Sequence, residues 1–247
     1  MYNLNYKSKI NLILDSFFEN FVLNMPCNNT YLPKYTTAIL IFACLFFQQN
    51  VIGQNGWTLK KDKNGIKVFA RKTAASKFNE LKVECVFDGR ISQLAAVLLD
   101  VNSQYQWVYK TSISSMLKKV SATEVYFYIV TEVPWPFDDR DVVIHMNLKQ
   151  NRANKTLTVL AKNVDGFLPA KEKMVRLKYS NAVWTITPIS NKQYKIDYRV
   201  QIDPGDGLPV WLLNLFSSEG PYESFKNLKE KVKLPPYAFA KFPFITD

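Results

Sequence analysis

Apolar and polar residues alternate through most of the chain from residue 57 to residue 202, which is the pattern of β-strands that turn one face toward a core. In the segment 79–88, one face carries Leu81, Val83, Cys85 and Phe87, and the other carries Glu80, Lys82, Glu84 and Asp88. The same pattern predicts strands at Ile66–Arg71, Glu124–Val133, Arg140–Lys149, Thr156–Lys162, Met174–Thr187 and Gln193–Ile202, with a more ambiguous extended segment at Ser112–Val120. The turns between these segments are short, which favours antiparallel neighbours over a parallel sheet.

The spacing of apolar residues becomes helical at two places. Ser92–Asp100 is predicted to be a helix, and a longer one is predicted to begin near Leu208 and to continue to residue 233. Gly220-Pro221 should kink or break the longer helix, because proline removes a hydrogen bond from a helix interior. One sheet must then bury its concave face against this helix. The predicted fold is therefore α+β and of the helix-grip type, with a curved antiparallel sheet wrapped around a long C-terminal helix and an internal hydrophobic cavity.

The segment Pro134–Asp141 joins two predicted strands through a proline-rich turn and ends in an Arg-Asp pair. Counting by twos from Arg140 gives Val142, Ile144, Met146 and Leu148, so an arginine begins a core-facing row. A buried guanidinium needs a partner. Either this strand end opens to water or the interior holds polar groups, and a cavity for an amphipathic molecule would give both. Asp141 falls on the opposite face, where it should cap the backbone or form a pair.

Residues 1–54 have the features of a leader. The short apolar run Thr36–Phe47 follows a basic residue and precedes polar and small residues, as in a secretory signal peptide. The run is shorter than the ~20 residues of an ordinary membrane span. We expect translation to start at Met25, the mature chain to begin near residue 54, and the protein to be exported to the periplasm or the extracellular space. A retained membrane anchor and lipoprotein processing at Cys44 are the alternatives.

The chain of 247 residues has a net charge of +11, and it keeps +10 without residues 1–54, which hold three lysines and two acidic residues. This charge favours anionic partners. An anionic membrane surface suits an exported protein better than nucleic acid, for which the sequence shows no zinc-ligand spacing and no RNA-binding signature. A merely soluble basic surface would explain the charge equally well. After residue 54 the only cysteine is Cys85, so the mature chain cannot form an internal disulfide.

Catalytic machinery is not visible in the sequence. His145 is the only histidine, with no partner at triad spacing and no second histidine for a metal. A glycine-rich phosphate loop, G-x-S-x-G and C-x-x-C are all lacking. The adjacent carboxylates Asp138 and Asp139 are more typical of a turn than of a glycosidase pair. We therefore expect no enzyme activity, no cofactor and no metal, and we expect a monomer.

Four segments in order resemble the StAR-related lipid transfer (START) family, of the helix-grip superfamily. They are the hairpin Trp57…Arg71, the strand–loop–strand segment Pro134-Trp135-Pro136…Arg140-Asp141, the start of the long helix Asp203-Pro204-Gly205…Asn214, and its end Leu228…Val232. The resemblance covers roughly Trp57 to Lys233. We expect a leader at 1–54, a START-like domain at 55–233 and a proline-rich tail at 234–247 that wraps the surface or is mobile. The resemblance implies a tunnel between sheet and helix that binds one lipid or sterol-like molecule for transfer or sensing, without catalysis.

The ligand-binding residues predicted from this resemblance and from the strand faces fall into three groups. Arg140 would contact a polar head group. The tunnel lining would comprise Phe127, Ile129, Ile144, Met146, Tyr198 and Val200 from the sheet and Trp211, Leu212 and Leu215 from the helix. Trp135 and Phe137 would form a gate at the mouth. The alternatives are plain core packing for the lining and, for Arg140, an ion pair with a nearby acid. Some family members place an acid opposite the arginine, but here Val130 is predicted at that place and Glu132 lies two residues on.

Two rival functions remain open from the sequence. A helix-grip cyclase or hydrolase could use Arg140 with cavity tyrosines such as Tyr128 or Tyr198. An interaction protein could fill its cavity with its own side chains. A cavity volume separates the interaction protein from both the carrier and the enzyme, and a ligand recovered unchanged separates the carrier from the enzyme.

Overall fold

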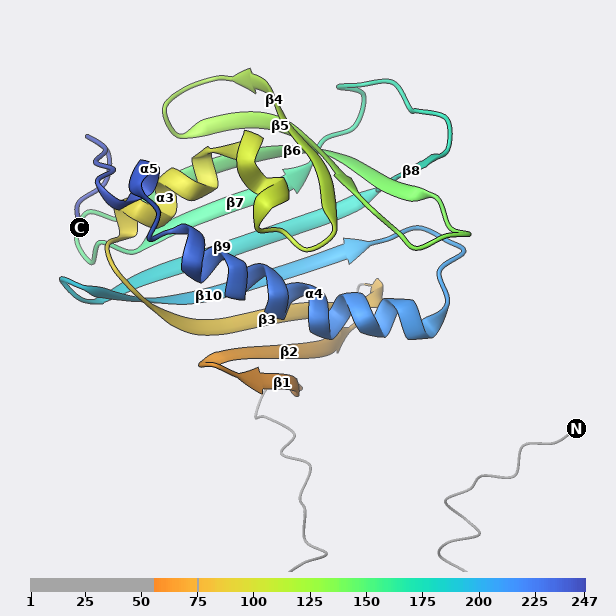
Figure 1. Cartoon of the computed structure of the whole chain (residues 1–247), viewed down its shortest axis with the longest axis horizontal. Helices are drawn as coiled ribbons and strands as arrows, with labels where there is room; N and C mark the ends of the chain where they lie inside the picture. Colours follow the sequence, from red (N-terminus) through yellow and green to blue (C-terminus); the bar gives the residue numbers. More distant parts are fainter. Residues whose placement is uncertain (1–55, 75) are drawn as a thin grey trace, which may run out of the picture. The chain divides into compact units, whose positions relative to one another are not determined.

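The structure is a computed structural model that describes residues 56–74 and 76–247, and the predicted leader lies outside these residues (Figure 1). The described residues belong to the compact unit Ile52–Asp247. The strands are β1 (Thr58–Lys63), β2 (Ile66–Thr73), β3 (Ser76–Asp88), β4 (Thr111–Lys119), β5 (Glu124–Thr131), β6 (Asp139–Gln150), β7 (Leu157–Asn163), β8 (Met174–Arg176), β9 (Tyr179–Ser190) and β10 (Gln193–Asp203). The helices are α3 (Ile91–Leu99), the 3-10 helix η1 (Val101–Gln106), α4 (Val210–Lys231) and α5 (Pro235–Ala238).

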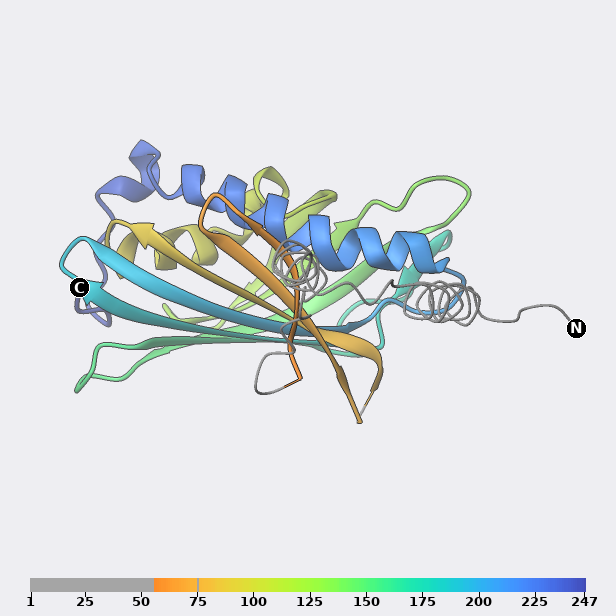
Figure 2. The same ribbon diagram turned by 90° about the horizontal axis from the view of Figure 1, so that it is seen from below.

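The ten strands form one sheet in the order β1-β2-β3-β10-β9-β7-β6-β5-β4, and β8 pairs with β6 beside this path. The β6–β8 pair is parallel, whereas the pairs along the path are antiparallel. The sheet curves around α4, which crosses its concave face (Figures 1 and 2). This arrangement confirms the predicted antiparallel helix-grip fold.

One predicted strand differs from the structure. The segment predicted as one strand, Met174–Thr187, forms the two strands β8 and β9, because the backbone N–H of Leu177 bonds to the Asp141 carbonyl oxygen at 2.9 Å and draws β8 alongside β6. The ambiguous segment Ser112–Val120 forms β4, one edge of the sheet.

The predicted break at Gly220-Pro221 is wrong, because α4 continues through Pro221 (Figure 2). An interior proline costs about 3 kcal/mol in a helix. Packing on its C-terminal side offsets this cost, since Tyr222, Phe225 and Leu228 are all buried. Gly220 allows close packing, because a Cβ there would lie 3.4 Å from Cδ1 of Tyr109.

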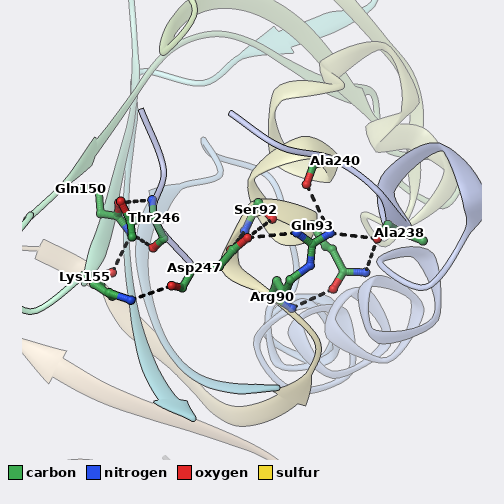
Figure 3. Close-up of polar contacts among 9 residues, drawn as sticks. All are labelled: Arg90, Ser92, Gln93, Gln150, Lys155, Ala238, Ala240, Thr246 and Asp247. Carbon is green, nitrogen blue, oxygen red and sulfur yellow. Dashed lines mark hydrogen bonds and ion pairs between the residues drawn. The ribbon is translucent and has the colours of Figure 1, made fainter. Parts of the chain in front are cut away.

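The C-terminal tail wraps the surface, which is one of its two predicted outcomes. Tyr237 is buried, and its hydroxyl donates to the Asp100 carboxylate at 2.6 Å. At the end of the tail, the Asp247 carboxylate accepts hydrogen bonds from the Ser92 backbone N–H at 2.8 Å and the Ser92 hydroxyl at 2.7 Å, which fixes the tail to the first turn of α3 (Figure 3). Within residues 56–74 and 76–247, no helix is long and apolar enough to cross a membrane.

Candidate functional site

The concave face of the sheet carries a row of mostly short side chains near the end where β6 begins. Strand register places this row side by side across five strands: Ala70, Leu81, Val200, Ala182 and Ala161. The next row, farther from that end, contains larger side chains: Val68, Val83, Tyr198, Trp184 and Val159. A pleated sheet whose side chains shorten toward one end leaves room there for the helix or for another molecule. We call the first set the alanine row.

An aromatic cluster fills the concave face beyond the alanine row. The Trp184 ring centroid lies 4.4 Å from that of Tyr198 and 5.2 Å from that of Phe225. Phe225 comes from α4, and Trp107 from the segment after η1 meets Trp184 at 6.5 Å in an edge-to-face arrangement. Such pairs contribute about 0.5–1.5 kcal/mol beyond their buried area. The cluster therefore fixes the C-terminal half of α4 on the sheet.

The N-terminal half of α4 is less firmly packed. Among its first ten residues, 210–219, all of which the structure describes, only Leu212 is buried, and the next buried residue is Gly220. The middle of the helix is held by the β1–β2 hairpin, where the Asn64 side-chain amide donates to the Tyr222 hydroxyl at 3.0 Å and the Lys61 ammonium donates to the Glu219 carboxylate at 2.5 Å. The helix thus has one half packed on the aromatic cluster and one half over the alanine row.

Arg140 lies at the end of the sheet below the start of α4. Its side chain is buried, and its guanidinium donates to the backbone carbonyls of Pro204 and Asp206, each at 3.2 Å, and to that of Asp138. Burial lowers the pKa of this guanidinium, although the nearby Asp138 and Asp139 carboxylates act in the opposite direction. Arg140 therefore connects the start of β6 to the loop that leads into α4.

Asp141, the next residue, also helps to hold a loop, on the outer face of the sheet. Arg176 binds its carboxylate with two hydrogen bonds of 2.8 and 3.0 Å, and the Tyr128 hydroxyl donates to it at 2.9 Å. Burial alone would raise the pKa of the Asp141 carboxyl, but the bonds from Arg176 and Tyr128 outweigh it and hold this pKa below its usual value. Arg176 also donates to the carbonyls of Leu168 and Pro169, so the β7–β8 loop is fixed to the sheet. The Arg-Asp pair holds two loops, one on each face.

The structure brings most predicted lining residues together. Phe127, Ile144 and Met146 belong to the main buried core, with Ile129 and Tyr198 partly buried against it. Val200 and Leu212 are buried outside that core cluster, Leu215 is half-buried, and Trp211 is 59% exposed. Trp135 is 91% exposed and Phe137 half-buried, in the loop before β6. These placements agree with one concave face.

Two expectations about the neighbours of Arg140 are wrong. Thr131 lies directly opposite Arg140, whereas Val130 pairs with Asp141 on the outer face. Tyr128 is not a cavity tyrosine, because it packs with Val130 and Val143 in a separate cluster outside the sheet. Both faces of β5 and β6 are buried at this end, so hydrophobicity alone did not distinguish them.

Some residues of the site were missed in the sequence, namely Trp184, Phe225 and the alanines of the alanine row. The alternation Ala182-Trp184-Ile186 in β9 gives all three the same face and could have identified the inward row. Phe225 was seen only as part of an apolar helix stripe. Its partners could not be found without the register between β9, β10 and the helix.

Two buried polar atoms near this site have no hydrogen-bond partner among the described residues: Trp107 Nε1 and Thr111 Oγ1. Thr111 pairs with Thr131, which pairs with Arg140, so the three form a polar row at the end of the concave face. A buried polar group without a partner costs free energy and calls for an explanation. A polar part of a bound molecule would supply one.

Two concavities in the described part of the chain lie elsewhere. One of about 460 Å³ is on the outer face and is lined by Glu80, Asn181, Val183, Thr185, Asp197, Arg199, Val200 and Gln201. One of about 300 Å³ is lined by Leu99, Met116, Lys119, Ala122, Val125, Phe242, Pro243 and Phe244. Neither lies between the concave face and α4, so the tunnel stays a prediction. No group of three or more His, Cys, Asp or Glu residues suited to a metal ion occurs in residues 56–74 and 76–247.

The sequence is similar to a known domain family and to several known proteins. A sequence profile of the START domain matches residues 42–236. The chain is 26% identical over 173 residues to an uncharacterised protein of Pseudomonas aeruginosa, covering 70% of this chain and 85% of that one. It is 24% identical over 191 residues to the phosphatidylcholine transfer protein of Mus musculus, covering 75% of this chain and 88% of that one.

Solved structures show the same likeness. A STAR-related lipid transfer protein from Xanthomonas axonopodis has a TM-score of 0.67 and 30% sequence identity, covering 73% of this chain and 100% of that chain. Human STARD10 has a TM-score of 0.64 at 21% identity, covering 74% of this chain and 76% of that chain. Two of these similar proteins, from Mus musculus and Xanthomonas axonopodis, are named as lipid transfer proteins.

Proposed function

This chain belongs to the START domain family, and on that premise we propose that it binds one hydrophobic or amphipathic lipid-like molecule for transfer or sensing. The ligand would lie between the concave face of the sheet and the N-terminal half of α4. We also propose that the chain carries this molecule without converting it chemically. The lipid transfer proteins among its relatives support the general function, and the residues below support the place.

The observation that carries the proposal is the alanine row under the less packed half of α4. Three of its five residues are alanine, in register across neighbouring strands. Tyr198, in the next row, is only half-buried, yet burial raises the pKa of its phenol. The ring packs on Trp184 and Phe225, so Tyr198 would lie at the boundary between the aromatic cluster and the proposed space. The aromatic cluster would close the far end of that space.

The polar end of the ligand would lie at the row of Thr111, Thr131 and Arg140. Thr111 Oγ1 is buried and unpartnered and can both donate and accept a hydrogen bond. The Arg140 guanidinium has five N–H donors, of which the carbonyl bonds use three. An amphipath with its polar group here and its apolar part toward Phe127, Ile129 and Ile144 matches this distribution.

We propose that the end of the domain near Arg140 is the tunnel mouth and that it docks transiently on an anionic membrane. Trp135, Val210 and Trp211 are 91, 72 and 59% exposed, and they belong to the β5–β6 loop and the start of α4. Exposed tryptophans suit the interface between water and lipid. Both segments lie at the same end of the molecule in Figures 1 and 2. The domain would dock as a monomer.

Export is a separate proposal that rests on the sequence pattern of residues 1–54. N-terminal sequencing of protein from its native host tests it directly. We expect a mature chain that begins near residue 54 in the periplasm or medium. A cytosolic chain that begins at Met1 would contradict export but would leave the ligand proposal intact.

The ligand proposal is tested by filling the space above the alanine row. The purified protein is incubated with vesicles of a mixed lipid extract, separated from them, and its bound lipid is identified by mass spectrometry. Wild type should retain one lipid per chain, chemically unchanged. Ala182→Phe should keep the fold and lose most of this uptake, because its ring would occupy the ligand's place.

Ala95→Phe is the matched control, because Ala95 is fully buried in α3 within the main core. Overpacking a filled core costs typically 1–3 kcal/mol, so this variant should lose stability. If Ala182→Phe loses as much stability as Ala95→Phe, the alanine row is filled core and the tunnel proposal fails. Recovery of a converted lipid would instead favour the rival enzyme.

A further inference from the structure

We infer that the end of the domain opposite the tunnel mouth carries a second docking surface, for an anionic lipid bilayer. It consists of Lys233, Leu234, Phe239 and Lys241, which flank α5, and we call it the tail surface. α5 and the start of α4 lie at opposite ends of the long axis of the described domain (Figures 1 and 2). The tail surface is therefore separate from the tunnel mouth.

Phe239 is the central feature of the tail surface, because its side chain is 82% exposed while its backbone is fixed. One guanidinium nitrogen of Arg90 donates to the carbonyls on both sides of it, to Ala238 at 3.1 Å and to Ala240 at 3.4 Å (Figure 3). The Gln93 side-chain amide also donates to the Ala238 carbonyl at 3.3 Å. Because the backbone around Phe239 is already ordered in the folded protein, docking would not have to lose backbone entropy there.

The neighbours of Phe239 show that its exposure is not due to a loose tail. Tyr237 is buried and bonded to Asp100, and Phe242 and Ile245 pack against the main core. Asp247 is held by Ser92 and by Arg90, whose guanidinium lies 3.1 Å from its carboxylate. The chain therefore buries apolar residues on both sides of Phe239 and presents that ring to solvent.

Charge decides the kind of partner. Residues 223–247 contain five lysines and three acidic residues, a net charge of +2. Lys231 is buried and Lys233 is ion-paired with Glu230, whereas Lys241 is exposed beside Phe239. Leu234 is 48% exposed next to Lys233, and Lys241 follows Phe239 closely. An exposed aromatic ring among lysines is the combination that inserts into the interface of an anionic bilayer, where the ring replaces water by lipid and the ammonium groups meet negative head groups.

Two docking surfaces at opposite ends allow one molecule to contact two bilayers at once. This step rests on the proposed docking of the tunnel mouth, whereas binding by the tail surface does not. A carrier with this arrangement could remain on one membrane through the tail surface while its mouth meets the other. Clustering of vesicles is the direct consequence that can be measured.

The test uses vesicles of phosphatidylcholine with and without phosphatidylserine, with sedimentation for binding and light scattering for clustering. Wild type should bind and cluster the anionic vesicles, and added salt should weaken both effects. Leu234→Ser/Phe239→Ser should still bind through the mouth but should lose at least tenfold in clustering. Leu160→Ser, at a 42% exposed residue on the outer face of β7, is the control and should behave as wild type.

The complementary variant Trp135→Ser/Trp211→Ser should bind through the tail surface alone, again without clustering. Wild type that fails to bind, or a Trp135→Ser/Trp211→Ser variant that fails to bind, would overturn the inference, as would full clustering by the tail variant. Wild type that binds without clustering, while the Trp135→Ser/Trp211→Ser variant still binds, would keep the tail surface and refute docking by the mouth. Sedimentation velocity without vesicles checks for dimers, and a dimer lost together with clustering in the tail variant would make this surface a protein interface instead. Lipid uptake is measured separately on the same samples, so a protein that clusters vesicles but takes up no lipid would refute only the proposed function.

Discussion

Replacing Arg140 by leucine tests how the start of β6 is joined to the loop before α4. The substitution removes three hydrogen bonds from a guanidinium to the carbonyls of Asp138, Pro204 and Asp206. These bonds join the start of β6 to the loop before α4. Leucine fits the apolar row that Arg140 begins, so the β-sheet itself should form.

The expected loss can be worked out from the geometry. Hydrogen bonds to charged groups contribute about 1.5–3 kcal/mol each. Two of the three bonds are 3.2 Å long, at the weak end of the usual range. Asp138 and Asp206 are exposed, so water can reach their carbonyls once the guanidinium is gone. We therefore expect Arg140→Leu to lower the free energy of unfolding by roughly 2–4 kcal/mol, or the melting temperature by roughly 5–15 °C.

The assay measures urea unfolding and lipid affinity on one preparation, below the melting temperature of the variant. Because the carbonyl bonds make Arg140 chiefly a tether, affinity per folded molecule should fall by less than the roughly tenfold that loss of one charged hydrogen bond brings. Arg140→Lys should recover part of the stability, since an ammonium keeps the charge but not the fork of donors. A variant with unchanged stability and a tenfold weaker affinity would refute the tether and leave ligand contact as the only role of Arg140.

Three further predictions concern the outer face, the aromatic cluster and α4. The pKa of Asp141 is lowered on folding, so its contribution to stability is present above its unfolded value, near pH 4, and is lost as pH falls through its folded value; Asp141→Asn should be less stable at pH 7 and should show a flatter stability profile in acid, and an unchanged profile would contradict the role of Arg176. Phe225→Ala should cost about 3–5 kcal/mol in urea unfolding, because it removes a buried ring from the aromatic cluster; a loss below 1 kcal/mol would mean that the cluster does not fix α4. Hydrogen exchange should be faster in residues 210–219 than in residues 222–231, and equal protection would argue against a movable half-helix.

The fold could be predicted because alternation and helical spacing recur over long segments. The row from Arg140 through Val142 to Leu148 was predicted from a count of two, and all its members are buried. The continuous helix through Pro221 could not be predicted from local preference, since tertiary packing at Tyr222 and Phe225 outweighs it. β8 was missed for a related reason, because it forms by pairing with the start of β6, a segment that is distant in the sequence.

The site was predictable only as a face, not as a set of contacts. Register errors of one residue exchange the two faces of a strand, and this is why Val130 was placed opposite Arg140 where the structure has Thr131. Tyr128 was assigned to the interior because β5 carries apolar side chains on both of its faces around this residue. The carbonyl partners of Arg140 lie more than sixty residues away in the sequence or leave no side-chain signal.

Native mass spectrometry of the purified protein, followed by organic extraction, tests the central claim most directly. We expect a complex of one chain with one lipid-like molecule, released unchanged into the organic phase and lost in Ala182→Phe. A folded wild-type chain that stays free of ligand after exposure to a total membrane lipid extract would contradict the claim that this domain binds a lipid beneath α4.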